Sequence, residues 1–360
     1  VFIHSPIERD EAKAAGLPLI DISRYNFTAL LREKGNRLEA TVELYRRIFA
    51  DLEVQGRVGF YGTDDAGRAF VFLRALDEAL SEVEVVGEYE RNVIALARET
   101  KDADEIARIR EIARRTCEVM EATVEFLRRH RVRDGVLVTE DGAPLTVGAV
   151  KRHILRLLAE RQLEDPEGVI FAIGRDAGVP HSKGQADAPI RLGHTIVYDL
   201  FPRYPRGYFF DVTRTFCLGH APPEVEKAYR DVADCLDAVI AEARVGVETR
   251  HLQRVACTFL EERGHPSVAS DPRTTEGFVH LIGHGLGLSI HEEPSFYDVP
   301  SNTRTLRPGH VFTVEPGVYY PDRGYGIRLE DVIWLDEEGE VHNLTDLPKR
   351  LVVEMAGGAA

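Results

Sequence analysis

The chain has 360 residues, of which 44% are hydrophobic and 29% are charged, as in ordinary globular proteins. This length suits one large domain together with one small one. Sixty acidic residues against 45 basic ones give a formal net charge of −15. Such a surface repels phosphate backbones and anionic lipids, so neither nucleic acid nor a membrane is an expected partner.

Residues 1–94 are predicted to form a small α/β domain. An apolar strand at 57–62, a helix at 66–80 and a second strand at 82–87 follow one another in this region. We therefore place the domain boundary just before residue 95.

Residues 95–360 are predicted to form the larger domain. Asp102 followed by Glu105 resembles a capping box, and an apolar stripe then runs from Ile106 to Leu127. Further helices are expected at 150–163, 222–243 and 249–265, and strands at 168–174, 194–201, 207–218, 310–320 and 326–335. Helices and strands grouped in blocks favour an α+β fold over a doubly wound sheet.

The cysteine pattern and the start of the chain bear on the compartment. Four cysteines are spread along the sequence without any Cys-x-x-Cys spacing, which is typical of free thiols in a reducing cytosol. No apolar run approaches the ~20 residues that cross a bilayer, and the start lacks the apolar stretch of a signal peptide. We expect a cytoplasmic protein.

Acidic residues interrupt the apolar strands. Four of them lie within segments whose sequence is typical of strands: Asp199, Asp211, Glu315 and Glu330. Burying a carboxylate costs free energy unless a cation or hydrogen-bond donors compensate it. An exposed strand end or a salt bridge would explain any one of them. Four such strands instead indicate an oxygen-rich site for Mn²⁺, Co²⁺, Zn²⁺ or Fe²⁺, and this many charges favours two ions. Asp199 and Asp211 also fit the two arms of a hairpin joined by the Pro- and Gly-rich FPRYPRG.

Three histidines lie in HLIGHGLGLSIHEEP, residues 280–294. The glycines disfavour a helix, so the histidines are not helical metal ligands. In a regular strand His280 and His284 share a face and His291 has the other, unless the glycines introduce a bulge. Glu292 and Glu293 are assigned no catalytic role. His251, His265 and His310 are expected to be solvated or capping residues.

Five motifs in order carry a resemblance to a known family. They are GVPHS with His181, Asp199 followed by DVTRT with Asp211, HLIGHGLGLSIHEEP, VEPGVYY with Glu315, and GIRLED with Arg328 and Glu330. Over residues 95–355 the sequence resembles the pita-bread metallopeptidases, which include prolidase, aminopeptidase P and methionine aminopeptidase. One departure is the segment after Asp199, which lacks the family's usual glycine and is one residue longer.

The resemblance implies a role for each matching residue. Asp199 would bind one metal ion, Asp211 and Glu330 would bridge two, and His284 and Glu315 would complete the second. The implied catalytic residues are Glu315, which would carry the proton, His291, which would hydrogen-bond the substrate carbonyl, and His280 and His181, which would line the pocket for proline. Arg328 would orient substrate or the ligand carboxylates, or else pair with a surface acid.

The same resemblance implies an Xaa-Pro peptidase with two divalent ions, Mn or Co first and Zn or Fe as alternatives. The substrate would be a peptide or dipeptide with proline second, and the protein a homodimer. The short N-terminal domain leans towards a dipeptidase over an aminopeptidase. A metal-free creatinase-like hydrolase and a non-enzymatic binding protein on this fold remain open, although both would be expected to have lost the ligands.

Overall fold

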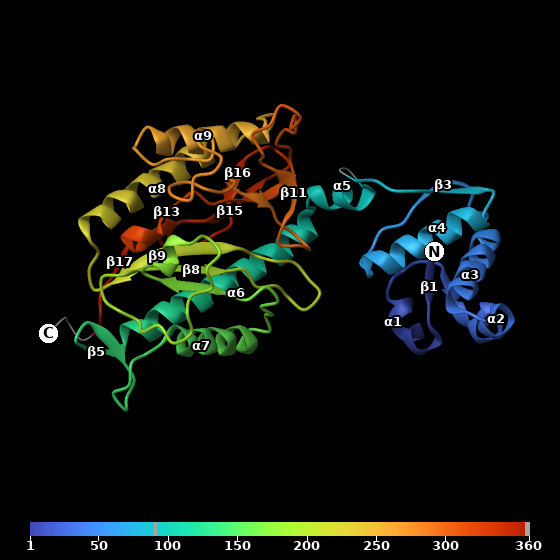
Figure 1. Cartoon of the computed structure of the whole chain (residues 1–360), viewed down its shortest axis with the longest axis horizontal. Helices are drawn as coiled ribbons and strands as arrows, with labels where there is room; N and C mark the ends of the chain where they lie inside the picture. The colour runs from blue at the N-terminus through green and yellow to red at the C-terminus, as the bar shows by residue number, and fades with distance from the viewer. Residues whose placement is uncertain (90–91, 357–360) are drawn as a thin grey trace. The chain divides into compact units, whose positions relative to one another are not determined.

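The computed structural model describes residues 1–89 and 92–356, and the chain divides into two compact units, Val1–Ile94 and Ala95–Ala360 (Figure 1). The first unit contains β1 (Phe2–His4), η1 (Pro6–Glu8), α1 (Arg9–Lys13), β2 (Leu19–Asp21), η2 (Ile22–Tyr25), α2 (Phe27–Lys34), α3 (Arg37–Asp51), β3 (Gly56–Gly59), α4 (Ala66–Ala79) and β4 (Val83–Val86). Strand β1 pairs in parallel with β2, and β3 with β4. The expected strand–helix–strand series is present as β3, α4 and β4. Helices α2 and α3 were not predicted.

The second unit carries the remaining elements. Its helices are α5 (Val93–Glu99), which begins just before the division between the units, α6 (Ala103–Arg128), α7 (Val147–Glu160), η3 (Asp176–Gly178), α8 (Pro223–Glu242), α9 (Thr249–Glu261) and η4 (Pro321–Arg323). Its strands are β5 (Arg131–Arg133), β6 (Val136–Val138), β7 (Ile170–Ile173), β8 (Thr195–Leu200), β9 (Val212–Leu218), β10 (His284–Gly285), β11 (Glu292–Ser295), β12 (Val311–Val314), β13 (Gly317–Tyr320), β14 (Tyr325–Arg328), β15 (Asp331–Leu335), β16 (Val341–Asn343) and β17 (Val352–Val353). The α+β prediction is confirmed.

In the second unit, strands β8, β9, β13 and β15 lie between two layers of helices (Figure 1). Helices α6 and α7 lie on one side, and α8 and α9 lie on the other (Figure 1). Helix α6 begins with the expected capping box between Asp102 and Glu105. One buried apolar cluster joins α6 and α7 to β8 and β9, and a second joins α8 and α9 to β12 through β15. The strands that carry the acidic residues therefore lie where the two cores meet.

Two sheets supply these strands. A four-stranded sheet has the order β17-β9-β8-β7, in which β8 is antiparallel to both neighbours. A five-stranded antiparallel sheet has the order β11-β10-β12-β15-β16. The predicted hairpin is confirmed, because β8 and β9 pair from Thr195 with Cys217 to Leu200 with Val212.

Two long strands of the prediction are each broken. The expected strand 310–320 is β12 and β13 with Glu315 and Pro316 between them, and the expected strand 326–335 is β14 and β15 with Glu330 at the break. Strands β13 and β14 pair with each other, whereas β12 and β15 pair in the five-stranded sheet. Continuous strands through the two glutamates were therefore a wrong expectation. Among the described residues, no helix is both long and apolar enough to cross a membrane.

Candidate metal centre

Asp199 and Asp211 come together because β8 and β9 are neighbours. Asp199 lies in β8 opposite Thr213, and Asp211 directly precedes β9. The two residues are only 7% and 4% exposed. Within the described part of the chain, the Oδ1 atom of each has no hydrogen-bond partner. Two buried and unpartnered carboxylate oxygens on adjacent strands fit a site for cations.

Glu315 and Glu330 reach the same place from the breaks between strands. The Thr213 hydroxyl donates to Glu330 Oε2 at 2.8 Å, so β9 also fixes this carboxylate. The Thr313 hydroxyl donates to Glu315 Oε1 at 3.4 Å. A residue that ends a strand is free of strict alternation, which allows both acids to turn toward the two aspartates.

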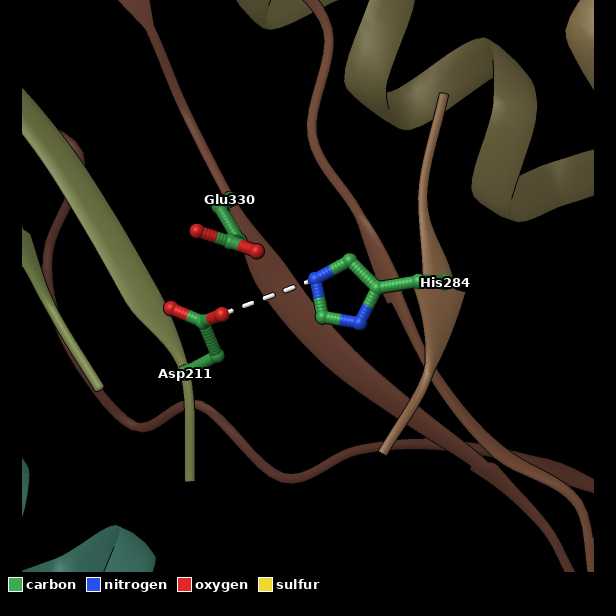
Figure 2. A group of neighbouring side chains, drawn as sticks. All are labelled: Asp211, His284 and Glu330. Atoms are coloured by element: carbon green, nitrogen blue, oxygen red, sulfur yellow. Dashed lines mark ion pairs between the residues drawn. The ribbon is translucent and has the colours of Figure 1, made fainter. Parts of the chain in front are cut away.

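His284 faces the carboxylates with a lone pair. Its Nδ1 lies 3.1 Å from the Gly285 carbonyl oxygen, which only accepts, so Nδ1 carries the proton. Its Nε2 lies 3.6 Å from both Asp211 Oδ2 and Glu315 Oε1. Single ligand atoms of Asp211, His284 and Glu330 all lie within 4.8 Å of one another, and Figure 2 shows these side chains pointing together. An imidazole lone pair among carboxylates suits a divalent ion.

The electrostatics of the cluster also favour a cation. Burial raises the pKa of Asp211 and Glu330 well above the usual value of each carboxyl, and neighbouring carboxylates raise it further. Burial raises the pKa of Glu315 as well. Three carboxyls that resist ionisation side by side are readily ionised once positive charge is placed among them.

The raised pKa of Glu330 gives a prediction for the metal-free protein. A folded-state pKa above the unfolded value stabilises the protein below the unfolded pKa, and this stability is lost as pH rises through the folded value. We expect Glu330→Gln, which cannot ionise, to gain stability relative to wild type as pH rises above 4.5, the usual value for the carboxyl. The gain is on the order of 1.4 kcal/mol per pH unit for one proton. Denaturant unfolding in chelator checks it, and a difference that is flat with pH would contradict it.

Arg328 holds Asp199, one of the predicted ligand carboxylates. Its Nη2 donates to Asp199 Oδ2, its Nε donates to the Thr213 hydroxyl at 3.1 Å, and its Nη1 donates to the Pro180 carbonyl at 3.0 Å. The residue is 2% exposed. Of the alternatives open from the sequence, pairing with a surface acid is wrong, because its partner is a buried acid of the site.

A hydrogen-bond chain runs from Arg328 to His280. Arg328 Nη1 donates to the Tyr319 hydroxyl at 2.8 Å, and this hydroxyl lies 2.8 Å from His280 Nε2. His280 Nδ1 lies 2.7 Å from the Leu281 carbonyl and therefore carries the proton, so Nε2 accepts from Tyr319. Burial and the charge of Arg328 lower the pKa of His280 to about 3, which leaves it neutral. The role of Tyr319 in this hydrogen-bond chain was not predicted from the sequence. Strand alternation in β13 places it only on the same face as Gly317.

His291 and His284 lie side by side, contrary to strict strand alternation. Their ring centroids are 4.3 Å apart and the rings are nearly perpendicular. The register shifts between His284 and Gly285, and β10 has only these two residues, so the alternation ends there. His181, just beyond η3, is exposed. Partial burial lowers the pKa of His291 to about 4, and the neighbouring imidazoles of His284 and His181 lower it further.

Two of the outer histidines are buried. His265 lies 2.7 Å from the Tyr320 hydroxyl and 3.1 Å from Asp231, and His310 is 0% exposed. The expectation that they are solvated is wrong for both. The alternative that they are capping residues fits His310, whose Nδ1 accepts from the Arg307 backbone N–H at 3.2 Å. His251 is partly exposed and lies 3.6 Å from Glu242.

Comparison with known proteins agrees with this geometry. The model of metallopeptidase family M24 matches residues 107–337. The chain belongs to family M24. The family is metal-dependent, as its name states, and the resemblance predicted from the motifs is confirmed.

Several family M24 relatives are peptidases by name. A probable dipeptidase PepE of Mycobacterium tuberculosis is 35% identical over 185 residues, which is 51% of this chain and 46% of the relative. An Xaa-Pro dipeptidase of Pyrococcus furiosus is 31% identical over 205 residues, 56% of this chain and 53% of the relative. The matched region thus spans about half the length of these curated relatives.

Solved structures share the fold along nearly the whole chain. The X-Pro aminopeptidase of Thermotoga maritima superposes with a TM-score of 0.74 at 24% identity, covering 98% of this chain and 87% of the other. The Xaa-Pro dipeptidase of Bacillus anthracis gives 0.75 at 22% identity, covering 98% and 86%. The pita-bread fold with a preceding N-terminal domain is therefore confirmed.

Proposed function

We propose that this chain is a dinuclear metallopeptidase that hydrolyses the Xaa-Pro bond next to a free amino terminus. One observation carries the proposal. The unpartnered Oδ1 atoms of Asp199 and Asp211 lie in the same cluster as a histidine nitrogen that faces carboxylates with its lone pair. Buried carboxylates that lie together repel one another, so a bound cation would stabilise them.

Asp199, Asp211, His284, Glu315 and Glu330 would hold the two ions. Bound divalent ions would supply a water molecule that is acidic enough to act as a nucleophile at neutral pH. Mn²⁺ or Co²⁺ suits this oxygen-rich set with a single imidazole, and Zn²⁺ or Fe²⁺ is an alternative. Arg328 keeps Asp199 oriented toward the site through Nη2.

Two residues of the chain would move or stabilise charge during peptide hydrolysis. The Glu315 carboxylate would accept the proton of the attacking water and return it to the departing proline nitrogen. His291, kept neutral by its lowered pKa, has one ring N–H to donate to the carbonyl oxygen as negative charge develops there.

The preference for proline is supported by the Xaa-Pro dipeptidase among the relatives. His280 and His181 would contact the proline ring. Both nitrogens of His280 are already hydrogen-bonded to protein groups, so it offers ring surface rather than a proton. A ring-shaped residue with no amide N–H suits such a surface, because it requires no hydrogen-bond partner there.

The function is tested by removing and restoring the metal. We expect protein treated with chelator and then dialysed to lose hydrolysis of Ala-Pro, and addition of Mn²⁺ or Co²⁺ to restore it. Release of free proline is the measurement, and Ala-Ala serves as the control substrate that should be cleaved poorly. Full activity in protein shown by elemental analysis to lack metal would overturn the mechanism.

A paired substrate decides the peptidase class. Ala-Pro and Ala-Pro-Ala differ only in a residue beyond proline, and we expect the dipeptide to be preferred. The reverse order would make the protein an aminopeptidase. We further propose a homodimer, as the resemblance to prolidase suggests, and a cytoplasmic location, which is supported by four buried free thiols. Light scattering after gel filtration measures the dimer.

A further inference from the structure

A buried ion pair lies directly behind the loop that carries His291. Lys101, in the segment between α5 and α6, places its Nζ 3.1 Å from Glu292 Oε2. The two side chains are only 1% and 6% exposed. Burying two charges costs solvation, and apolar side chains of similar volume often stabilise a fold equally well. Stability alone is therefore a poor reason for the pair to be here.

Glu292 uses its second oxygen to hold the loop. Its Oε1 accepts from the Ser289 backbone N–H at 2.8 Å. A Cβ at Gly287 would lie 2.3 Å from Glu292 Oε2 and 2.9 Å from Lys101 Cε, so only glycine leaves room for the pair. The Gly287 N–H in turn donates to the Ser289 carbonyl at 3.1 Å. Residues 287, 289 and 292 are thus packed as one unit, immediately next to His291.

Lys101 is itself fixed to the rest of the site. Its backbone N–H donates to the Gly309 carbonyl at 2.8 Å, and its Nζ donates to the Arg98 carbonyl at 2.7 Å. Gly309 lies just before β12, the strand that Glu315 directly follows. The ion pair therefore ties the loop of His291 to the same backbone that places Glu315.

His291 has little other support. Within the described residues, no hydrogen bond reaches its imidazole, and its ring contact is with the edge or face of His284. A hydrogen-bond donor must be held closely to act on a developing charge. The next residue, Glu292, is held through both of its carboxylate oxygens.

We propose that Lys101 and Glu292 are positioning residues, which hold the loop of His291 so that its imidazole meets the carbonyl oxygen of the substrate. This inference rests on the proposed role of His291. Neither side chain hydrogen-bonds to a predicted metal ligand, so the pair acts through the loop. The two acids after His291 then have different roles. Glu292 orients the histidine, whereas Glu293 forms an ion pair with Arg304 at 2.9 Å.

The first test is Lys101→Met in the Mn²⁺-loaded enzyme acting on Ala-Pro. We expect kcat to fall by about 10- to 100-fold, because displacing a catalytic group by ~1 Å costs on that order. KM should change by less than about 3-fold, since the change acts on the transition state. Metal content should be unchanged. Lys13→Met, which breaks an exposed pair with Asp10, is the matched control and should keep the wild-type kcat.

The decisive comparison repeats Lys101→Met in a His291→Ala background. If the pair acts through His291, removing the lysine should lower kcat by less than about 2-fold once the imidazole is gone. An equal fall in both backgrounds would overturn the inference and show a general effect on the fold. If His291→Ala alone leaves kcat unchanged, the proposed role of His291 fails instead.

A second readout does not depend on activity. Hydrogen exchange of the Ser289 amide should be roughly 10-fold faster in Lys101→Met, because Glu292 no longer has a fixed position. Unchanged exchange together with unchanged kcat would overturn the proposal. If Lys101→Met does not fold, the double variant Lys101→Met/Glu292→Gln removes both charges and leaves no unpaired one, and the same outcomes are required of it.

Discussion

Asp211→Asn is expected to abolish peptidase activity while leaving the protein folded. Asparagine keeps the shape of the side chain but removes the negative charge, so we expect kcat on Ala-Pro to fall by about 10³-fold or more. Elemental analysis should show a loss of bound metal. Because Asp211 is repelled by Asp199 and Glu315, the metal-free variant should be at least as stable as metal-free wild type.

The matched control for this variant is Asp298→Asn. Asp298 lies on the surface, where it pairs with Arg254 at 2.7 Å. The change in charge and shape is the same, but Asp298 is exposed and pairs with Arg254 rather than with any predicted ligand, so metal content and kcat should stay at wild-type values. Full metal content and full kcat in Asp211→Asn would contradict the role of this aspartate.

The part of the site that depends on local chain geometry could be predicted from the sequence. A Pro- and Gly-rich connection between two apolar strands indicates a hairpin, and a hairpin places residues near its turn close together. Asp199 and Asp211 are therefore adjacent in the structure as expected. The expected type of ligand was also inferred from chemistry alone, because acids within apolar segments need compensation.

The breaks at Glu315 and Glu330 could not be predicted from periodicity. Each acid lies where the chain leaves one sheet and enters another pairing, and the apolar text is continuous across the break because both sides are buried. Strand alternation failed for the same kind of reason at His291, since β10 is only two residues long. Such switches are set by the packing of whole sheets.

Contacts between distant segments also lay beyond the sequence. Lys101 and Glu292 are 191 residues apart, and neither has a local pattern that marks it as buried. Charged residues are usually exposed, and for Arg328 the sequence left pairing with a surface acid open as one alternative. A buried charge is intelligible only once its partner is known, and the partner is chosen by the fold.

Arg328→Met is expected to destabilise the metal-free protein strongly. Arg328 is buried and holds Asp199, and removing one partner of a buried ion pair costs about 3–5 kcal/mol. Denaturant unfolding at pH 7 in chelator measures the loss. The change in stability is opposite in sign to that of Asp211→Asn, because Arg328→Met removes a positive charge from a cluster of carboxylates.

The pairing itself is tested by combining Arg328→Met with Asp199→Asn. With both charges removed no unpaired buried charge is left, so the double variant should lose clearly less stability than the sum of the single changes. The exposed pair of Arg254 and Asp298 provides the control cycle, in which Arg254→Met should cost less than about 1 kcal/mol and its coupling to Asp298→Asn should be small. Strict additivity at the buried pair would mean that Arg328 stabilises the protein through its hydrogen bonds to Tyr319 and the Pro180 carbonyl instead. Asp199 would then be oriented only when metal ions are bound.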